Sequence, residues 1–104
     1  MAYKVVVTSD AEADLDRFLS YLVIEKNSVS SAKNVLNDFE ETKKALADVA
    51  GDLKLCDNPR LNKLGYRRIN FRTHRYFMLY RIEDKKVVVD KIFHALQDYE
   101  NKLI

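Results

Sequence analysis

The sequence predicts an α+β domain in which two helices cover one face of a sheet whose last three strands are antiparallel. Apolar residues recur at three- and four-residue spacing in the first half of the chain, as they do on one face of a helix. From Gly65 onward the spacing changes to alternation, which is typical of strands. The last three predicted strands are joined by turns too short for a parallel crossover, so they should pair antiparallel.

The composition favours one folded domain over residues 1–104. Of the 104 residues, 47% are hydrophobic and 33% charged, which excludes disordered and fibrous classes. Cys56 is the only cysteine, so neither an internal disulfide nor a thiolate-rich zinc cluster can form. Because no P-loop or metal pattern occurs, we expect no cofactor and no metal. No apolar run approaches the ~20 residues of a membrane span and no signal segment is present, so we expect a cytoplasmic protein that binds no membrane.

The first half of the chain predicts one strand and a helix hairpin. Residues 3–8 are short and β-branched, which favours a strand. Ser9 and Glu12 then have the spacing of a capping box, which predicts the start of the first helix. The serines of residues 28–31 can cap a second helix, and Gly51 is a plausible stop for it. Because the connection between the two helices is short, they should pack as an antiparallel hairpin.

The second half predicts a three-stranded antiparallel meander and a short C-terminal helix. The first of these strands follows Gly65, the second spans residues 76–82 and the third spans residues 87–93. Residues 98–103 should form the helix. The central strand is apolar on both faces, and we expect one of these faces to belong to the core: Tyr76, Met78, Tyr80 and Ile82.

The strand after Gly65 predicts a functional face of the sheet. Ile69 and Phe71 alternate with polar and basic residues, so one face of this strand should be apolar. The helices should cover that face. The opposite face would then carry Arg68, Asn70 and Arg72 together, exposed and available for binding.

Positive charge is concentrated in residues 52–75. The first fifty residues hold six Lys and Arg against nine Asp and Glu, whereas the remainder hold twelve against seven. The stretch 52–75 accounts for this excess. Its basic residues are Lys54, Arg60, Lys63, Arg67, Arg68, Arg72 and Arg75. A concentrated basic segment predicts an anionic partner, either nucleic acid or an acidic protein, although such residues can also serve solubility alone.

Four segments in this order resemble the RelE/ParE superfamily of toxins, and more closely its ParE or plasmid-stabilisation branch. That branch has an Ala/Asp-rich first helix, to which SDAEADLDRFLSYL at residues 9–22 is similar. Its Arg-bearing strand follows a Pro/Leu/Gly segment, to which NPRLNKLGYRRI at residues 58–69 is similar. HRYFMLYRIED at residues 74–84 resembles its Tyr-containing central strand, and VVVDKIFHALQDYE at residues 87–100 resembles its last strand, which ends in His. The resemblance spans essentially the whole chain.

The resemblance implies a type II toxin that inhibits growth and is neutralised by a cognate antitoxin encoded in the same operon. ParE members bind and poison DNA gyrase, whereas RelE members are mRNA interferases that act on the ribosome. In the RelE-like nucleases an Arg follows a Tyr in the strand equivalent to residues 76–82, and Phe77 stands at that position here. This favours a non-enzymatic ParE-like toxin.

Two alternatives to a ParE-like toxin remain. A second register aligns His74 and Arg75 with the His-Arg pair of YoeB-type nucleases, so a metal-independent, ribosome-dependent mRNA endonuclease is one of them. A degenerate, non-toxic binding partner is the other.

The candidate site residues follow from these alternatives. A nuclease needs a phosphate clamp and a general acid or base, for which the candidates are Arg68, Arg72, Arg75 and His94. Binding of a partner or of phosphate would use basic and exposed aromatic residues. These are Lys54, Arg60, Lys63, Tyr66, Arg67, Arg68, Arg72, Arg75 and Tyr99. The simpler interpretation is that the cations are solvated, that His94 caps its strand or hydrogen-bonds Asp98, and that Cys56 is a packed or idle thiol.

Overall fold

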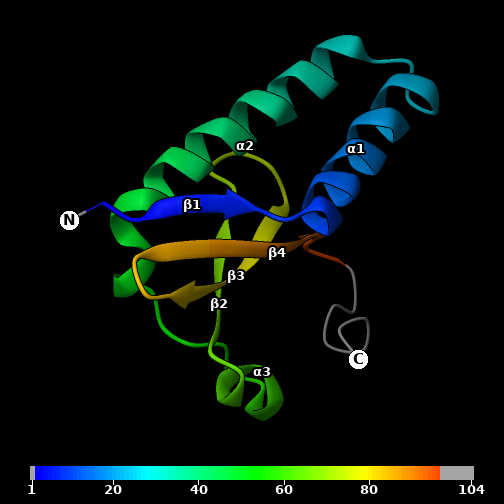
Figure 1. Ribbon diagram of the computed structural model, residues 1–104. Coiled ribbons are helices and arrows are strands. Elements are labelled where there is room, and N and C mark those ends of the chain that lie inside the picture. The colour runs from blue at the N-terminus through cyan, green and yellow to red at the C-terminus, as the bar shows by residue number, and fades with distance from the viewer. Residues whose placement is uncertain (1, 97–104) are drawn as a thin grey trace.

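The protein, described here over residues 2–96 by a computed structural model, forms a four-stranded sheet with a helix hairpin on one side (Figure 1). Its elements in chain order are β1 (Lys4–Val7), α1 (Ser9–Ile24), α2 (Val29–Val49), a 3₁₀ turn (Ala50–Asp52), α3 (Pro59–Lys63), β2 (Tyr66–Asn70), β3 (Tyr76–Glu83) and β4 (Lys86–His94). The predicted α+β class, hairpin and meander are confirmed. The predicted helix at residues 98–103 lies outside the described residues.

The sheet has the strand order β1-β4-β3-β2. β2, β3 and β4 pair antiparallel as predicted, with Tyr80 opposite Arg67 on one side and Val89 on the other. β1 lies parallel to β4, with Val5 opposite Val87, so the first strand completes the sheet beside the last. Its parallel pairing is possible because the whole hairpin and meander separate the two strands.

The two helices begin with hydroxyl caps, but the first cap is one residue earlier than predicted. Thr8, not Ser9, caps α1, because its side-chain oxygen accepts the Ala11 N–H at 3.2 Å. Ser9 is already the first helical residue, so the predicted capping box with Glu12 is wrong. Ser28 caps α2 as expected, accepting the Ser31 N–H at 3.1 Å.

The end of α2 and the connection after it also differ in part from prediction. α2 ends at Val49, and Gly51 lies inside the following 3₁₀ turn. A Cβ at Gly51 would lie 2.7 Å from the Tyr3 hydroxyl oxygen, so close approach explains this glycine. The unpredicted α3 is capped by Asn58, whose side chain accepts two backbone N–H groups, and is followed by Gly65 at φ 82°.

The core has a layer on each face of the sheet. Under the hairpin, Met78 and Tyr80 are fully buried with Leu46, which confirms the predicted core face of the central strand. The Tyr80 hydroxyl donates to the carbonyl oxygen of Ala50 at 2.8 Å, and burial raises the pKa of Tyr80 to about 12. The opposite face carries a smaller buried cluster: Phe77, Leu79, Phe93, Leu61 and Cys56. Cys56 is therefore the packed thiol that the simpler interpretation expected.

Two buried carboxylates attach the hairpin to the sheet. Asp14 of α1 accepts the backbone N–H of Ile92 in β4 at 3.0 Å and pairs with Arg17. Asp38 of α2 accepts hydrogen bonds from the turn between β2 and β3. Each carboxylate lies on a mainly apolar helix face, so its desolvation must be offset by these bonds. Over residues 2–96, no helix is both long and apolar enough to cross a bilayer.

Candidate binding surfaces

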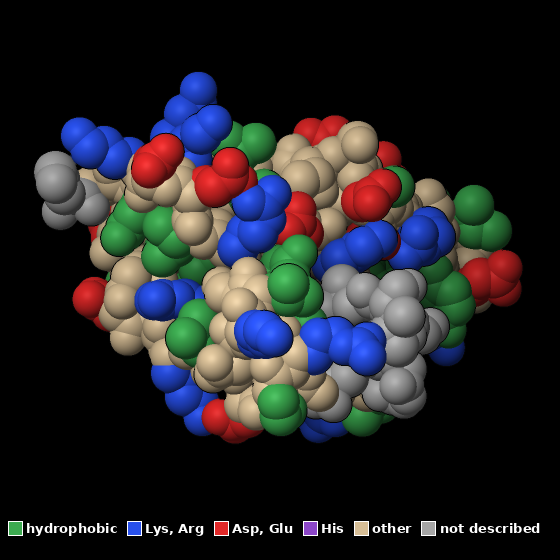
Figure 2. Space-filling view, turned by 60° about the horizontal axis from the view of Figure 1, so that its bottom comes forward, with side chains coloured by type: hydrophobic (Ala, Val, Ile, Leu, Met, Phe, Trp, Pro, Cys, Tyr) green, Lys and Arg blue, Asp and Glu red, His purple; other side chains and the backbone are tan. Residues whose placement is uncertain are grey.

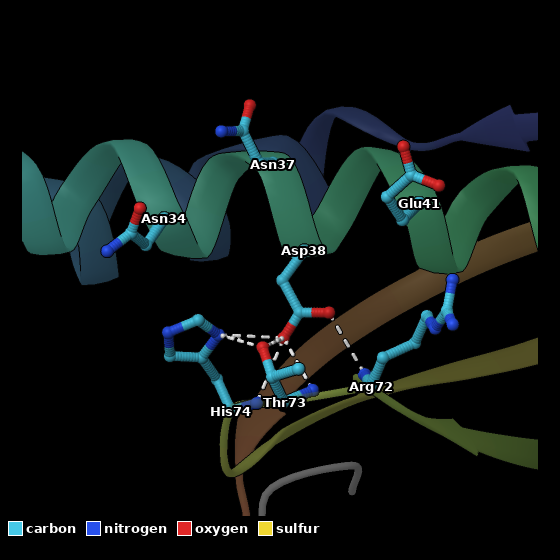
Figure 3. Close-up of a pocket in the computed structure, with 7 residues that line it drawn as sticks. All are labelled: Asn34, Asn37, Asp38, Glu41, Arg72, Thr73 and His74. Atoms are coloured by element: carbon cyan, nitrogen blue, oxygen red, sulfur yellow. Dashed lines mark hydrogen bonds and ion pairs between the residues drawn. The ribbon is translucent and has the colours of Figure 1, made fainter.

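Asp38 fixes the turn between β2 and β3 against α2 (Figure 3). Its Oδ1 accepts the Arg72 backbone N–H at 3.0 Å. Its Oδ2 accepts the Thr73 N–H and hydroxyl, both at 3.0 Å, and the His74 N–H at 2.9 Å. His74 Nδ1 lies 2.7 Å from the same oxygen. One side chain thus satisfies three consecutive backbone donors and sets the conformation of residues 72–74.

The ionisation of Asp38 determines which nitrogen of the His74 ring carries a proton. Burial alone would raise the pKa of Asp38, but hydrogen bonds from His74, Thr73 and Arg72 outweigh it, and the pKa is lowered. An ionised carboxylate only accepts hydrogen bonds, so His74 Nδ1 must carry the proton. The other ring nitrogen, Nε2, then points away from Asp38, as Figure 3 shows.

Two adjoining cavities border this turn. The first, of about 410 Å³, contains Asp38, Glu41 and Arg72 (Figure 3). The second, of about 370 Å³, we call the histidine cleft; its polar lining is Ser31, Asn34, Thr73, His74, Arg75 and His94. The two cavities share Asn34, Thr73 and His74, so the Asp38-bound turn forms a wall of each.

His94 ends β4 in the histidine cleft, where it has a structural role. Its ring meets the Tyr76 ring edge-on, with centroids 5.2 Å apart and planes at 88°. Its Nδ1 accepts the Leu96 N–H at 3.2 Å, so His94 caps its strand end.

The face of the sheet away from the hairpin, here the outer face, carries Arg68. Its guanidinium carbon lies 3.8 Å from the centre of the Phe77 ring, and its Nε donates to Asn70 Oδ1 at 2.9 Å. Arg68 also borders a cavity of about 320 Å³ together with Lys54 and Asp57. Lys54 and Asp57 form an exposed ion pair at 3.1 Å. Stacking on the buried Phe77 ring orients the Arg68 guanidinium.

Two other residues that were predicted to contact a partner instead form hydrogen bonds within the fold. Arg67 points to the hairpin side, where its NH1 group donates to the carbonyl oxygens of Ala50, Gly51 and Leu53. Tyr66 is half-buried, not exposed as expected, and its hydroxyl donates to Asp90 at 2.8 Å. Burial, reinforced by this hydrogen bond to the Asp90 carboxylate, raises the pKa of Tyr66.

The structure separates the basic residues that the sequence grouped together. Arg68 lies on the outer face, whereas Arg72 lines the cavity beside α2 and Arg75 lines the histidine cleft. The prediction that Arg68 and Arg72 share a strand face is wrong. β2 ends at Asn70, and Asp38 draws the chain that follows toward α2.

On the face shown in Figure 2, lysine and arginine side chains of the described residues do not form one continuous field. Arg60 and Lys63 are exposed on α3. Figure 2 views the molecule from the end at which α3 lies, and it shows cationic groups interspersed with acidic and hydrophobic ones. Tyr99 lies outside the described residues. Among residues 2–96, no cluster of three His, Cys, Asp or Glu side chains could hold a metal ion.

The sequence reasoning missed Asp38, which organises the turn. A signal was present, because Asp38 falls on the apolar stripe of α2 between Val35 and Thr42, both buried. An acidic residue at such a position indicates a buried carboxylate with several donors. His74 was expected to be exposed in a tight turn, yet it is half-buried and bound to Asp38.

Comparison with known proteins gives one family and two similar folds. The family described as ParE toxin of type II toxin-antitoxin system, parDE, matches residues 5–99. A solved structure described as the chromosomal ParDE TA system from P. aeruginosa is similar with a TM-score of 0.72 and 22% identity, over 90% of this chain and 97% of that one.

The second similar structure is described as the toxin-antitoxin complex RelBE2 from Mycobacterium tuberculosis. It has a TM-score of 0.59 and 21% identity, over 90% of this chain and 99% of that one. At such identities the two structures support the fold alone. No curated protein sequence matches the chain significantly.

Proposed function

The chain belongs to the family of ParE toxins of type II toxin–antitoxin systems, and we propose that it acts as such a toxin. It inhibits growth by binding a cellular target, with DNA gyrase as the first candidate, and a cognate antitoxin from the same operon neutralises it. The observation that carries this proposal is the family match over residues 5–99, nearly the whole chain. The two similar structures, both toxin–antitoxin systems by description, support the antitoxin as a partner.

A binding mechanism fits the arrangement of side chains better than catalysis does. Phe77 is uncharged and fully buried, so the residue at this position cannot stabilise a phosphorane. His94 is engaged in structural contacts, because its Nδ1 accepts the Leu96 N–H and its ring packs edge-on against Tyr76. Arg68 is on the opposite side of the sheet from Arg75 and His94, so these three candidates cannot act on one phosphate.

The antitoxin would dock on the outer face, with Arg68 as its main ionic contact. The Arg68 side chain is ordered by Phe77 and Asn70, so little entropy is lost when it meets an acidic residue of the partner. We expect Arg68→Ala to weaken antitoxin binding and to reduce its dependence on salt, compared with Lys85→Ala at the exposed β3–β4 turn. Equal affinities and equal salt slopes for the two variants would place the docking site elsewhere.

Two parallel readouts test the mechanism. After induction of the chain, plasmid superhelicity should change while messenger RNA remains intact, and the purified protein should inhibit supercoiling by gyrase. The alternative, a ribosome-dependent mRNA endonuclease, rests on Arg75 and His94 sharing the histidine cleft. Fragmented messenger RNA with normal superhelicity would favour it. If neither readout changes and growth is normal, the degenerate-partner alternative holds.

A further inference from the structure

We propose that the histidine cleft binds the phosphate group of a phosphate ester. The cleft lies between the α1–α2 hairpin and the ends of the strands, and its volume of about 370 Å³ is that of a small ligand site. Of its lining residues, Arg75 supplies a fixed positive charge and two are histidines. This site is separate from the outer face assigned to the antitoxin, so either proposal can fail without the other.

Charge distinguishes the histidine cleft from three other cavities formed by the described residues. The cavity beside it includes the carboxylates Asp38 and Glu41, and that on the outer face includes Asp57, which pairs with Lys54. A cavity between α1 and α2 contains several acidic side chains. The described lining of the histidine cleft contains neither Asp nor Glu. Among residues 2–96, an anion entering the cleft meets no carboxylate in its lining.

Arg75 is the residue with which the anion would pair. Its side chain is exposed and forms no ion pair with any residue in the described range 2–96. Its backbone is held, because the Arg75 carbonyl oxygen accepts the Ala95 N–H at 2.7 Å and joins the turn to the end of β4. A planar guanidinium on a fixed backbone suits bidentate contact with phosphate oxygens.

The hydrogen bonds of His74 orient its ring for the same ligand. Asp38 accepts the hydrogen bond of Nδ1–H, so Nε2 faces away from that carboxylate and becomes a donor when the ring is protonated. Both oxygens of Asp38 are already used by residues 72–74, which limits its repulsion of an anion. Asp38 therefore positions His74 and does not compete for the cleft.

The number of donors favours phosphate over carboxylate. Ser31 and Asn34 add a hydroxyl and an amide to Arg75 and His74 on the other walls of the cleft. The two oxygens of a carboxylate lie in one plane with its carbon, whereas the terminal oxygens of a phosphate ester, three in a monoester and two in a diester, point to corners of a tetrahedron. The polar groups of α2 lie on one wall of the cleft and those of the turn lie on another. Oxygens that point in several directions, as in phosphate, can contact both walls.

The test is titration of the full chain, followed through the ring signals of His74 and His94 by NMR. The probes are inorganic phosphate, adenosine 5′-monophosphate and a single-stranded hexaribonucleotide. We expect saturable shifts of the His74 signal with each probe. Tighter binding of the hexanucleotide than of the mononucleotide would identify a nucleic-acid backbone as the source of the phosphate, and equal binding would identify a free ester.

Matched variants separate the cleft from general charge. Arg75→Gln should weaken binding about tenfold, the worth of one charge-assisted hydrogen bond at a partly exposed site. Lys85→Gln removes the same charge at the exposed turn between β3 and β4 and should change affinity less than about twofold. Arg75→Lys keeps the charge and should lie between wild type and Arg75→Gln. Unmoved ring signals, or equal losses in Arg75→Gln and Lys85→Gln, would overturn the proposal.

Discussion

Replacing Asp38 tests how the turn that carries Arg72, His74 and Arg75 is held in place. Asp38→Asn keeps the size of the side chain but removes its charge and puts an amide N–H₂ where one acceptor was. The wild-type carboxylate accepts five hydrogen bonds, from the backbone of residues 72–74 and from the side chains of Thr73 and His74. The variant can satisfy only some of these donors.

The expected loss follows from these contacts. The side chain of Asp38 is 4% exposed, so solvent screens its hydrogen bonds little. Arg72 and Thr73, however, lie at the surface, where water can replace the lost carboxylate as their hydrogen-bond acceptor. Removing one partner of a buried ionic contact costs ~3–5 kcal/mol, and we place Asp38→Asn near the lower end, at about 3 kcal/mol, because of this water. For a domain of this size that corresponds to a Tm about 15 °C lower.

The assay is urea unfolding of wild type, Asp38→Asn and the control Asp48→Asn. Asp48 is an exposed acid on the same helix, and its replacement should cost less than about 0.5 kcal/mol. Equal stabilities of the two variants would refute the assigned role of Asp38. NMR spectra should also show displaced signals for residues 72–75 in Asp38→Asn alone.

The same pair of proteins gives a pH dependence with a definite sign. The pKa of Asp38 is lowered in the folded chain, so the unfolded chain binds the proton more readily. The contribution of Asp38 to stability is therefore present above its ordinary pKa and is lost as the pH falls toward the folded value. Between about pH 5 and pH 2, wild type should lose more stability than Asp38→Asn does. Parallel curves would contradict the lowered pKa.

Three further substitutions have defined outcomes. Arg67→Ala removes the donors to the carbonyl oxygens of Ala50, Gly51 and Leu53, and it should lower the free energy of unfolding in urea by about 2 kcal/mol. An unchanged stability would show that water replaces the guanidinium as donor. Gly65→Ala places a Cβ at φ 82° after α3 and should cost about 1 kcal/mol by the same assay; an unchanged stability would mean that the turn relaxes freely. His94→Ala should retain toxicity if the protein acts by binding, while a stably folded variant that no longer arrests growth, beside wild type that fragments messenger RNA, would favour the nuclease alternative.

The architecture could be predicted from the sequence because local patterns determine it. The 3.6-residue period of residues 9–49 and the alternation after Gly65 each depend on neighbours in the chain. The choice of Thr8 over Ser9 as the cap is different. The Thr8 hydroxyl also donates to the Asp90 carbonyl oxygen of β4 at 3.2 Å, a contact between residues that are distant in sequence. Only the folded sheet brings these two groups together.

The candidate site could be predicted only in its composition. The basic segment was evident, yet alternation alone placed Arg72 on the same face as Arg68. That extrapolation fails because a carboxylate from α2 ends the strand at Asn70 and redirects the chain. α3 could have been found, since Asn58 followed by Pro59 is a helix-start pattern and Gly65 a stop. The burial of Asp38 could also have been predicted, because an acidic residue on the apolar face of a helix indicates a buried carboxylate.

Growth after induction tests the central claim most directly. Cells expressing this chain alone should stop dividing, and expression of the reading frame beside it in the same operon should restore growth by forming a complex that co-purifies with the chain. An uninduced culture and the exposed-site variant Lys85→Gln, which should remain toxic, provide the controls. Normal growth in cells that accumulate the folded chain would contradict its action as a toxin.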